Sequence, residues 1–237
     1  MTEQPVAIVV GAGGIGSALC RFWQEESGYR VVALSRRSLD DVGYDWRASD
    51  YSEESLRAIV ESLQQESISI ERLVITNGLL SSDGISPERK IADLDPEKFH
   101  EVLAVNSVLP AMVLKAFMPL IRASSAPRIA VLSARVGSIE DNKLGGWYAY
   151  RASKAALNML LRTASIELKR INRRAKLIAY HPGTVDTPLS KPFQRNVPSD
   201  QLLTPEFAAR RLHEVLLAAD SAGELSYLDW RGETIPW

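Results

Sequence analysis

Two residues of the sequence, Tyr150 and Lys154, have the types and the spacing needed to move a proton. On a helix, residues four apart lie one turn apart on the same face, so the phenol and the ammonium group would be neighbours. A nearby positive charge favours the phenolate and lowers the pKa of a tyrosine, which is ordinarily about 10. Such a pair could act as a general acid or base near neutral pH. An exposed helical pair without function has the same spacing. The elements that position the pair must therefore distinguish these two interpretations.

A glycine-rich turn near the N-terminus is the second candidate site. It follows the apolar run 5–10, which predicts a buried parallel strand, and it precedes a helical pattern through about residue 27. The residues of the turn are Gly11, Gly13, Gly14, Ile15 and Gly16. Strand, glycine turn and helix form the context of a dinucleotide-binding motif: Gly11 would allow the tight turn, Gly13 the approach of a pyrophosphate, and Gly16 close packing of helix on strand. The helix N-terminus would offer its free N–H groups to the phosphates. The other interpretation is a glycine turn without a ligand.

The end of the second predicted strand, 30–35, indicates which dinucleotide is bound. An acidic residue there would bind the free 2′-hydroxyl of NAD, but this chain has Ser35, Arg36 and Arg37. A guanidinium matches the oxygens of a 2′-phosphate, so we predict NADP(H), preferred over NAD(H), against the alternative of a solvated basic turn. Asp40 and Asp41 come too late to be the ribose acid, although a bent loop could bring one back.

The rest of the chain alternates between strand and helix patterns. Strands are predicted at 72–76, 128–132, 176–180 and 224–229, with a possible short one around 42–44, just before Asp45. Helices are predicted at 52–65, 96–122, 147–172 and 205–219. The pattern is that of an α/β protein: a single domain spanning 1–237, with a Rossmann-like doubly wound parallel sheet of about seven strands and helices on both faces. Tyr150 and Lys154 would lie on the helix after the fifth strand, beyond the strand ends where such sheets bind ligands.

Composition excludes several other classes. The 237 residues carry a formal net charge of −1, which gives no bulk attraction to nucleic acid or to an anionic membrane. The single cysteine cannot form an intrachain disulfide, and the three histidines show no metal-ligand spacing, so we expect no metal. No basic-then-apolar leader and no membrane-spanning apolar run is evident, which predicts a cytoplasmic protein.

Four features in order make the chain resemble the short-chain dehydrogenase/reductase family over nearly its whole length. They are the glycine turn, the Asn77-Gly78 pair after the fourth strand, Tyr150-x-x-x-Lys154, and the Pro182-Gly183 turn after the sixth strand. The stretch R-V-G-S-I…G-G-W-Y-x-Y-R-A-S-K-A-A-L-N and the I-P-W ending resemble the C-factor (C-signal) group more narrowly.

The resemblance implies a reaction and roles for individual residues. Tyr150 would exchange a proton with a small-molecule carbonyl or alcohol substrate during hydride transfer, and Lys154 would lower the pKa of Tyr150 and bind the nicotinamide ribose. Asn106 would hold a water that links Lys154 to solvent; from the residues alone, a hydrogen-bonded core asparagine explains it as well. Cofactor contacts would come from Asn77, Gly78, Pro182, Gly183, Val185 and Thr187, with Asp45 facing the adenine. Family members often pair through the two long helices, which implies a homodimer or homotetramer.

The chain also departs from the family pattern. Two residues rather than three separate Gly11 from Gly14, and the usual N-N-A-G is reduced to T-N-G. Ala134 stands where the catalytic serine is expected, which leaves Ser133, Ser138, or no serine at all with a backbone N–H or a water in its place. Adjacent strand residues face opposite ways, so Ser133 substitutes only if the strand has ended or bulged there. The missing serine motivates a second hypothesis, a dinucleotide-binding signalling or regulatory protein with little catalysis. For an enzyme, the substrate pocket would be lined from 79–91, 139–147 and 189–203.

Overall fold

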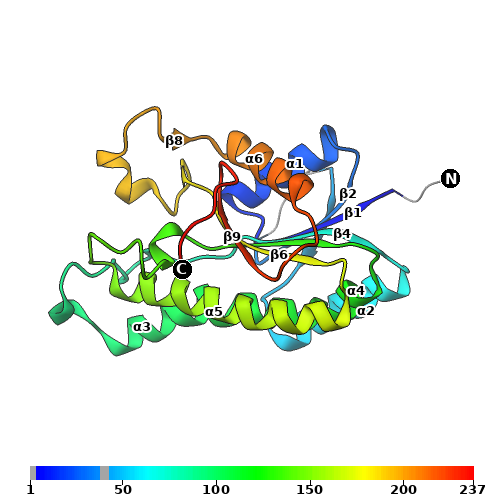
Figure 1. Ribbon diagram of the computed structural model, residues 1–237, viewed down its shortest axis with the longest axis horizontal. Coiled ribbons are helices and arrows are strands. Elements are labelled where there is room, and N and C mark those ends of the chain that lie inside the picture. Colours follow the sequence, from blue (N-terminus) through cyan, green and yellow to red (C-terminus); the bar gives the residue numbers. More distant parts are fainter. Residues whose placement is uncertain (1–3, 38–42) are drawn as a thin grey trace.

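The centre of the molecule is a seven-stranded parallel sheet with the strand order β3-β2-β1-β4-β5-β6-β9 (Figure 1). The computed structural model describes residues 4–37 and 43–237. The strands of this sheet are β1 Val6–Val10, β2 Arg30–Ser35, β3 Asp45–Ala48, β4 Ile70–Ile75, β5 Arg128–Leu132, β6 Lys176–His181 and β9 Ser226–Asp229. The order of the strands reverses between β1 and β4, which is where open α/β sheets bind ligands. The predicted Rossmann-like fold is therefore confirmed.

Helices cover both faces of the sheet. On one face lie α1 (Gly14–Glu25) and α6 (Pro205–Ala218), and on the other lie α2 (Glu53–Gln65), α4 (Leu109–Ala123) and α5 (Tyr148–Ile171) (Figure 1). In β1, Ala7 and Val9 join the core under α1 and α6, whereas Ile8 and Val10 join the core on the other face. Because side chains alternate along a strand, every residue of β1 is buried, as its apolar sequence predicts. Two short strands, β7 (Thr184–Val185) and β8 (Leu202–Leu203), form a separate pair.

The helix starts follow side-chain caps that satisfy backbone N–H groups. Ser52 accepts a hydrogen bond from Ser55 N at the start of α2, and Thr204 accepts one from Phe207 N at the start of α6. Asp95 caps α3 (Pro96–Leu103) in the same way. Each cap supplies an acceptor that the first turn of a helix lacks.

The long helix predicted over 96–122 is one helical stretch with an irregular middle. A π-helical turn, Ala104–Val108, separates α3 from α4 and contains Asn106. Such turns are frequent at functional sites. The stretch Pro96–Ala123 is long and apolar enough to cross a membrane. Its side chains Val113, Phe117 and Ile121 are nevertheless fully buried in the core, so it is built as a core helix.

The third strand lies later in the chain than predicted. The structure has β3 at Asp45–Ala48, and Val42 of the expected run lies outside the described residues, as do Asp40 and Asp41. The register pairs Val32 with Asp45 and Ser35 with Ala48, so Asp45 stands at the amino end of β3. The sequence D-W-R-A of this edge strand carries two charged residues, and an apolar run therefore does not mark it.

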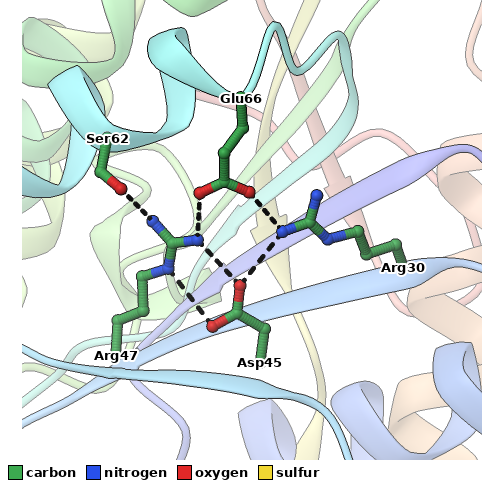
Figure 2. A network of polar contacts seen from close by, with 5 residues as sticks. All are labelled: Arg30, Asp45, Arg47, Ser62 and Glu66. Atoms are coloured by element: carbon green, nitrogen blue, oxygen red, sulfur yellow. Dashed lines mark hydrogen bonds and ion pairs between the residues drawn. The ribbon is translucent and has the colours of Figure 1, made fainter.

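Asp45 takes part in an ion-pair network there (Figure 2). Its carboxylate accepts from Arg47 Nη2 at 2.9 Å and from Arg30 Nη2 at 3.4 Å. Glu66, at the end of α2, accepts from the same two arginines at 2.7 and 2.5 Å. We call Arg30, Asp45, Arg47 and Glu66 the β2–β3–α2 network. The position of Asp45 at the amino end of β3 and its pairing with two arginines argue against the predicted adenine contact, which stays a prediction.

Candidate active site

The helix α5 carries the predicted pair, Tyr150 and Lys154, to the carboxyl end of β5. Lys154 is 2% exposed, and its Nζ donates to the carbonyl oxygen of Leu132 at 2.8 Å. The same Nζ lies 5.8 Å from the centroid of the Tyr150 ring. Gly137 packs directly on the helix, since a Cβ at Gly137 would stand 2.8 Å from Lys154 Cβ. The two side chains are therefore neighbours on one face of α5, and the backbone around them is closely packed.

Tyr150 is half-buried and Lys154 is buried. Burial shifts the pKa of both groups. It raises the pKa of Tyr150 well above the ordinary value of 10, and Tyr227 adds a smaller effect in the same direction. It also lowers the pKa of Lys154 to about 7. The lowered tyrosine pKa expected from the Tyr150–Lys154 spacing is therefore not what the structure shows. The ammonium lies beside the ring and donates to Leu132, and its own charge is disfavoured by burial.

Asn106 is fully buried and connects three elements. Its Nδ2 donates to Leu79 O at 2.8 Å and to Ser153 Oγ at 3.0 Å, while its Oδ1 accepts from Leu79 N at 2.7 Å. A Cβ at Gly78 would lie 3.7 Å from Asn106 Oδ1 and 3.9 Å from Lys154 Nζ. The end of β4, the π-helical turn and α5 thus meet beside Lys154. The amide of Asn106 is satisfied by protein atoms, and its role in a water relay stays a prediction.

The structure separates the two candidate serines. Ser133 Oγ donates to Asn158 Oδ1 at 2.6 Å, one helical turn beyond Lys154. β5 ends at Leu132, so Ser133 lies just beyond the strand, and Ala134 after it keeps an extended backbone. Ser138 Oγ accepts from Asp141 N at 3.1 Å, and among the described residues no acceptor takes its hydroxyl proton. This arrangement argues against the predicted role of Ser133 and favours Ser138.

The glycine turn has the packing expected of a phosphate-binding turn. Gly11 has φ +95°, and a Cβ at Gly16 would stand 2.1 Å from Gly11 O, so helix and strand meet as closely as predicted. Around Gly13, which precedes α1, no protein atom lies within 4 Å of a Cβ position. Thr76, which the sequence analysis did not single out, holds the turn by donating its hydroxyl to Gly11 O. The open side at Gly13 and the free N–H groups of α1 fit a pyrophosphate.

Two further segments close around this turn. Thr187 Cγ2 lies 2.9 Å from a Cβ position on Gly14, and Val185, beside the turn at Pro182 and Gly183, is buried. Gly183 has φ +80° and packs against Leu203 and Trp230. Ile15 packs against two groups of side chains, the cluster of Val185, Leu203 and Ala208 and the core under α1. The Pro182–Thr187 segment is thus brought to the glycine turn, as a shared cofactor groove requires.

The predicted 2′-phosphate site lies at the carboxyl end of β2. Ser35 is buried, and its hydroxyl donates to Arg37 O at 2.6 Å. Arg36 and Arg37 are exposed. The Arg36 guanidinium lies 5.9 Å from the ring centroid of Tyr51, a residue that the sequence analysis missed. Asn77 Oδ1 is buried and has no partner among the described residues. An orphaned buried oxygen beside the glycine turn fits a ligand group that donates to it.

A cavity of about 250 Å³ opens beside Tyr150. Its lining includes Leu80, Ile85, Glu88 and Val102, so of the three predicted pocket segments only 79–91 contributes. Asp93, Asp95 and Lys98 also line it, and no sequence signal had marked them. Among the described residues, no group of His, Cys, Asp and Glu side chains could hold a metal ion.

Comparison with known proteins identifies the family to which this fold and site belong. The family profile described as short chain dehydrogenase matches residues 5–198, and the chain belongs to that family. This is a family of oxidoreductases that bind a nicotinamide dinucleotide.

Three individual proteins show more specifically what this chain is similar to. The C-signal protein of Myxococcus xanthus is 31% identical over 147 residues, covering 62% of this chain and 83% of that protein. The 1-hydroxy-2-glutathionyl-2-methyl-3-butene dehydrogenase of Rhodococcus sp. (strain AD45) is 28% identical over 188 residues, covering 78% of this chain and 76% of that enzyme. A crystal structure of a short-chain dehydrogenase/reductase from Burkholderia multivorans with bound NADP superposes with a TM-score of 0.81, at 25% identity, and covers 99% of this chain and 100% of that one. The resemblance to the C-factor group is confirmed.

Proposed function

We propose that this protein is an NADP(H)-dependent oxidoreductase that interconverts a carbonyl and an alcohol, with Tyr150 as the general acid and base. The observation that carries the proposal is the convergence at Lys154. Its Nζ stands near Gly78 at the end of β4, next to Asn106, and one helical turn from Tyr150. The pair is therefore placed at the edge of the sheet where the glycine turn lies, and a protein that only bound a dinucleotide would not need a tyrosine there.

The residues around the groove suit NADP(H). Gly11, Gly13 and Gly16 with the start of α1 would hold the pyrophosphate, and Arg36 would hold the 2′-phosphate. Val185 and Thr187 would contact the carboxamide, and Lys154 the nicotinamide ribose. When bound, the nicotinamide supplies or accepts the hydride. The NADP bound to the Burkholderia multivorans relative supports this choice of cofactor.

The chain's own contribution to the reaction is proton transfer and polarisation of the carbonyl. In reduction, the Tyr150 hydroxyl donates its proton to the carbonyl oxygen, and in oxidation it takes one from the alcohol. Ser138, whose hydroxyl proton has no acceptor among the described residues, would donate a hydrogen bond to the same oxygen.

A tyrosine without its hydroxyl tests the proposal. Tyr150→Phe should abolish reduction across a panel of aldehydes and ketones with NADPH and leave the Kd of NADPH within about twofold, since a phenol–carbonyl hydrogen bond matters only for the reacting oxygen. Ser138→Ala should slow the same reaction by about 10²-fold, and Ser133→Ala should change it little. Retained turnover in Tyr150→Phe would rule out the mechanism.

The second candidate function is a dinucleotide-binding regulatory protein with little catalysis. Ala134 at the expected serine position and the engagement of Ser133 with Asn158 favour it. NADPH binding without oxidation by any carbonyl compound in the panel would support this alternative over the enzyme.

We further propose a cytoplasmic homodimer or homotetramer. Large apolar side chains are exposed on both long helical stretches: Met159 (66%) and Leu160 (41%) on α5, Val108 (51%) in the π-helical turn, and Met112 (40%) on α4. Burying such a surface between copies would be favourable. A monomeric mass in light scattering would contradict this assembly.

A further inference from the structure

Trp147, three residues before Tyr150, has a backbone conformation that tryptophan rarely adopts. Its φ is 55°, and the two residues before it, Gly145 and Gly146, have φ values of 66° and 67°. Glycine takes the left-handed conformation at little cost, whereas a bulky aromatic residue is strained in it. A third glycine would form the same turn without strain. The side chain is therefore present for what it touches.

Contacts on three sides hold this strained residue in place. Its N–H donates to Glu88 O at 2.6 Å, and its carbonyl oxygen accepts from Arg151 N at 2.8 Å. The Arg151 side chain donates to Gly146 O at 2.9 Å and to Gly145 O at 3.2 Å. Glu88 also accepts from Ala149 N through its carboxylate at 3.1 Å. Strain of this kind persists only where the surroundings enforce it, and it concentrates at functional sites.

The indole lies between the proton donor and the segment that follows the sixth strand. Its ring centroid is 6.1 Å from that of Tyr150 and 5.2 Å from that of Phe193, both in edge-on geometry. Phe193 belongs to the 3₁₀ helix Lys191–Asn196, and Leu189 just before it lies 3.7 Å from a Cβ position on Gly78. In Figure 1 this segment and the loops before α3 and α5 gather at the same end of the molecule, at the left. The Trp147 ring thus contacts both Tyr150 and the 3₁₀ helix Lys191–Asn196, and its backbone N–H bonds to the loop that carries Glu88.

The surroundings of Trp147 are apolar and open. Trp147 is itself half-buried, and Leu144 and Ile139 of the same loop are 93% and 78% exposed. Ile91, on the loop that supplies Glu88, is 70% exposed. These side chains lie outside the lining of the cavity beside Tyr150, and exposed apolar side chains grouped near a site are typical of a surface that binds an apolar ligand.

We propose that Trp147 is a specificity-determining residue, whose indole contacts the substituent on the reacting carbonyl and selects carbonyl compounds with an aromatic or bulky apolar group. The inference rests on the proposed function, because it places the carbonyl oxygen at Tyr150. A planar ring 6.1 Å from the phenol would offer its face or edge to an aromatic substituent bonded to the carbonyl carbon. A small aliphatic substituent would gain little from the same contact.

A matched pair of diketones tests this role. We would compare kcat/KM for 1-phenyl-1,2-propanedione and for 2,3-butanedione, which share the reacting group and differ in the ring. Trp147→Gly permits the same backbone and removes the indole, and it should lower the ratio of the two kcat/KM values at least tenfold, whereas Trp147→Phe should keep the ratio within about threefold. Trp46→Phe, on the far edge strand β3, is the control for loss of a tryptophan and should leave the ratio unchanged.

The readouts separate failure of this inference from failure of the proposed function. NADPH affinity, measured by titration calorimetry, should be the same in the wild-type protein and all three variants. A wild-type protein that fails to bind NADPH would contradict the proposed function itself. Wild-type protein that reduces other carbonyl compounds of the panel with NADPH, but reduces the phenyl diketone no better than 2,3-butanedione or reduces neither diketone, would overturn the substrate class. A ratio unchanged in Trp147→Gly, or equal losses for both diketones, would show that Trp147 only shapes the loop.

Discussion

Gly16 and Gly13 should have different roles in the glycine turn, and separate replacement by alanine tests this. Gly16→Ala should lower stability, whereas Gly13→Ala should weaken ligand binding. A Cβ at Gly16 would stand 2.1 Å from Gly11 O and 2.9 Å from Thr76 Oγ1, so α1 would have to move away from β1 by roughly 1 Å to restore an ordinary contact. Overpacking of this size costs about 2–3 kcal/mol, and for a domain of this length each kcal/mol lowers Tm by about 2–4 °C. Gly16→Ala should therefore lower Tm by roughly 4–12 °C.

Gly13→Ala should behave in the opposite way. No protein atom lies within 4 Å of its Cβ position, and its φ of −104° suits any residue. The remaining cost is the poorer helix cap, about 0.5–1 kcal/mol. The added methyl would occupy the space assigned to the pyrophosphate, so NADPH should bind at least about tenfold more weakly.

Thermal unfolding followed by circular dichroism, with and without NADPH, measures both effects in one experiment. Wild-type protein should gain Tm on addition of NADPH, Gly13→Ala should be nearly as stable as wild type but gain less, and Gly16→Ala should be destabilised even without NADPH. Each variant serves as the control for the other. Full NADPH binding by Gly13→Ala would refute the phosphate role of the turn, and unchanged stability of Gly16→Ala would refute the close packing of α1 on β1.

Two further predictions concern charged residues at opposite ends of the sheet. Arg36→Glu should weaken NADPH binding and improve the use of NADH relative to NADPH, because the carboxylate would repel a 2′-phosphate; an unchanged ratio of the two kcat/KM values would remove the argument for NADP(H). Glu66→Gln should cost about 1 kcal/mol at neutral pH, since two guanidinium groups lose a shared, partly exposed carboxylate. The pKa of Glu66 is lowered from 4.5 mainly by its hydrogen bonds to Arg30 and Arg47, so this stability is present above pH 4.5 and is lost as the pH falls through the lowered value. Urea unfolding should accordingly show a difference between variant and wild type that shrinks below about pH 4, and a constant difference would contradict the assignment.

The sequence predicted those parts of the fold that depend on local pattern. The limits of β2 and β5, Arg30–Ser35 and Arg128–Leu132, are those predicted, because short runs of branched apolar residues are buried on both faces of a parallel sheet. The edge strand β3 was predicted too early in the chain, because it pairs with only one other strand and its sequence carries charges of the β2–β3–α2 network. Asp45 was therefore assigned to the wrong end of the strand.

The site was predictable as a set of residue types but not as a set of protonation states. The spacing of Tyr150 and Lys154 correctly indicates neighbours on one helix face. It contains no information on burial, and burial reverses the expected direction of the tyrosine pKa. Trp147 was expected only as part of the pocket segment 139–147, and Tyr51 was not expected at all. Their positive φ values, 55° and 66°, depend on tertiary contacts that a single sequence does not display.

The protonation of Tyr150 and Lys154 bears on the direction of the reaction. A general acid must carry its proton before it reacts, and burial keeps Tyr150 protonated throughout the neutral range. Oxidation would need the phenolate, and Lys154 loses the charge that would stabilise it as the pH rises through about 7. Reduction of a carbonyl by NADPH should therefore vary less than about twofold in kcat/KM between about pH 6 and about pH 8, and oxidation of the matching alcohol should be slower throughout. A tenfold fall in the reduction rate as the pH rises through 7 would show that Tyr150 loses its proton there, and that Lys154 does lower its pKa as the spacing alone suggests.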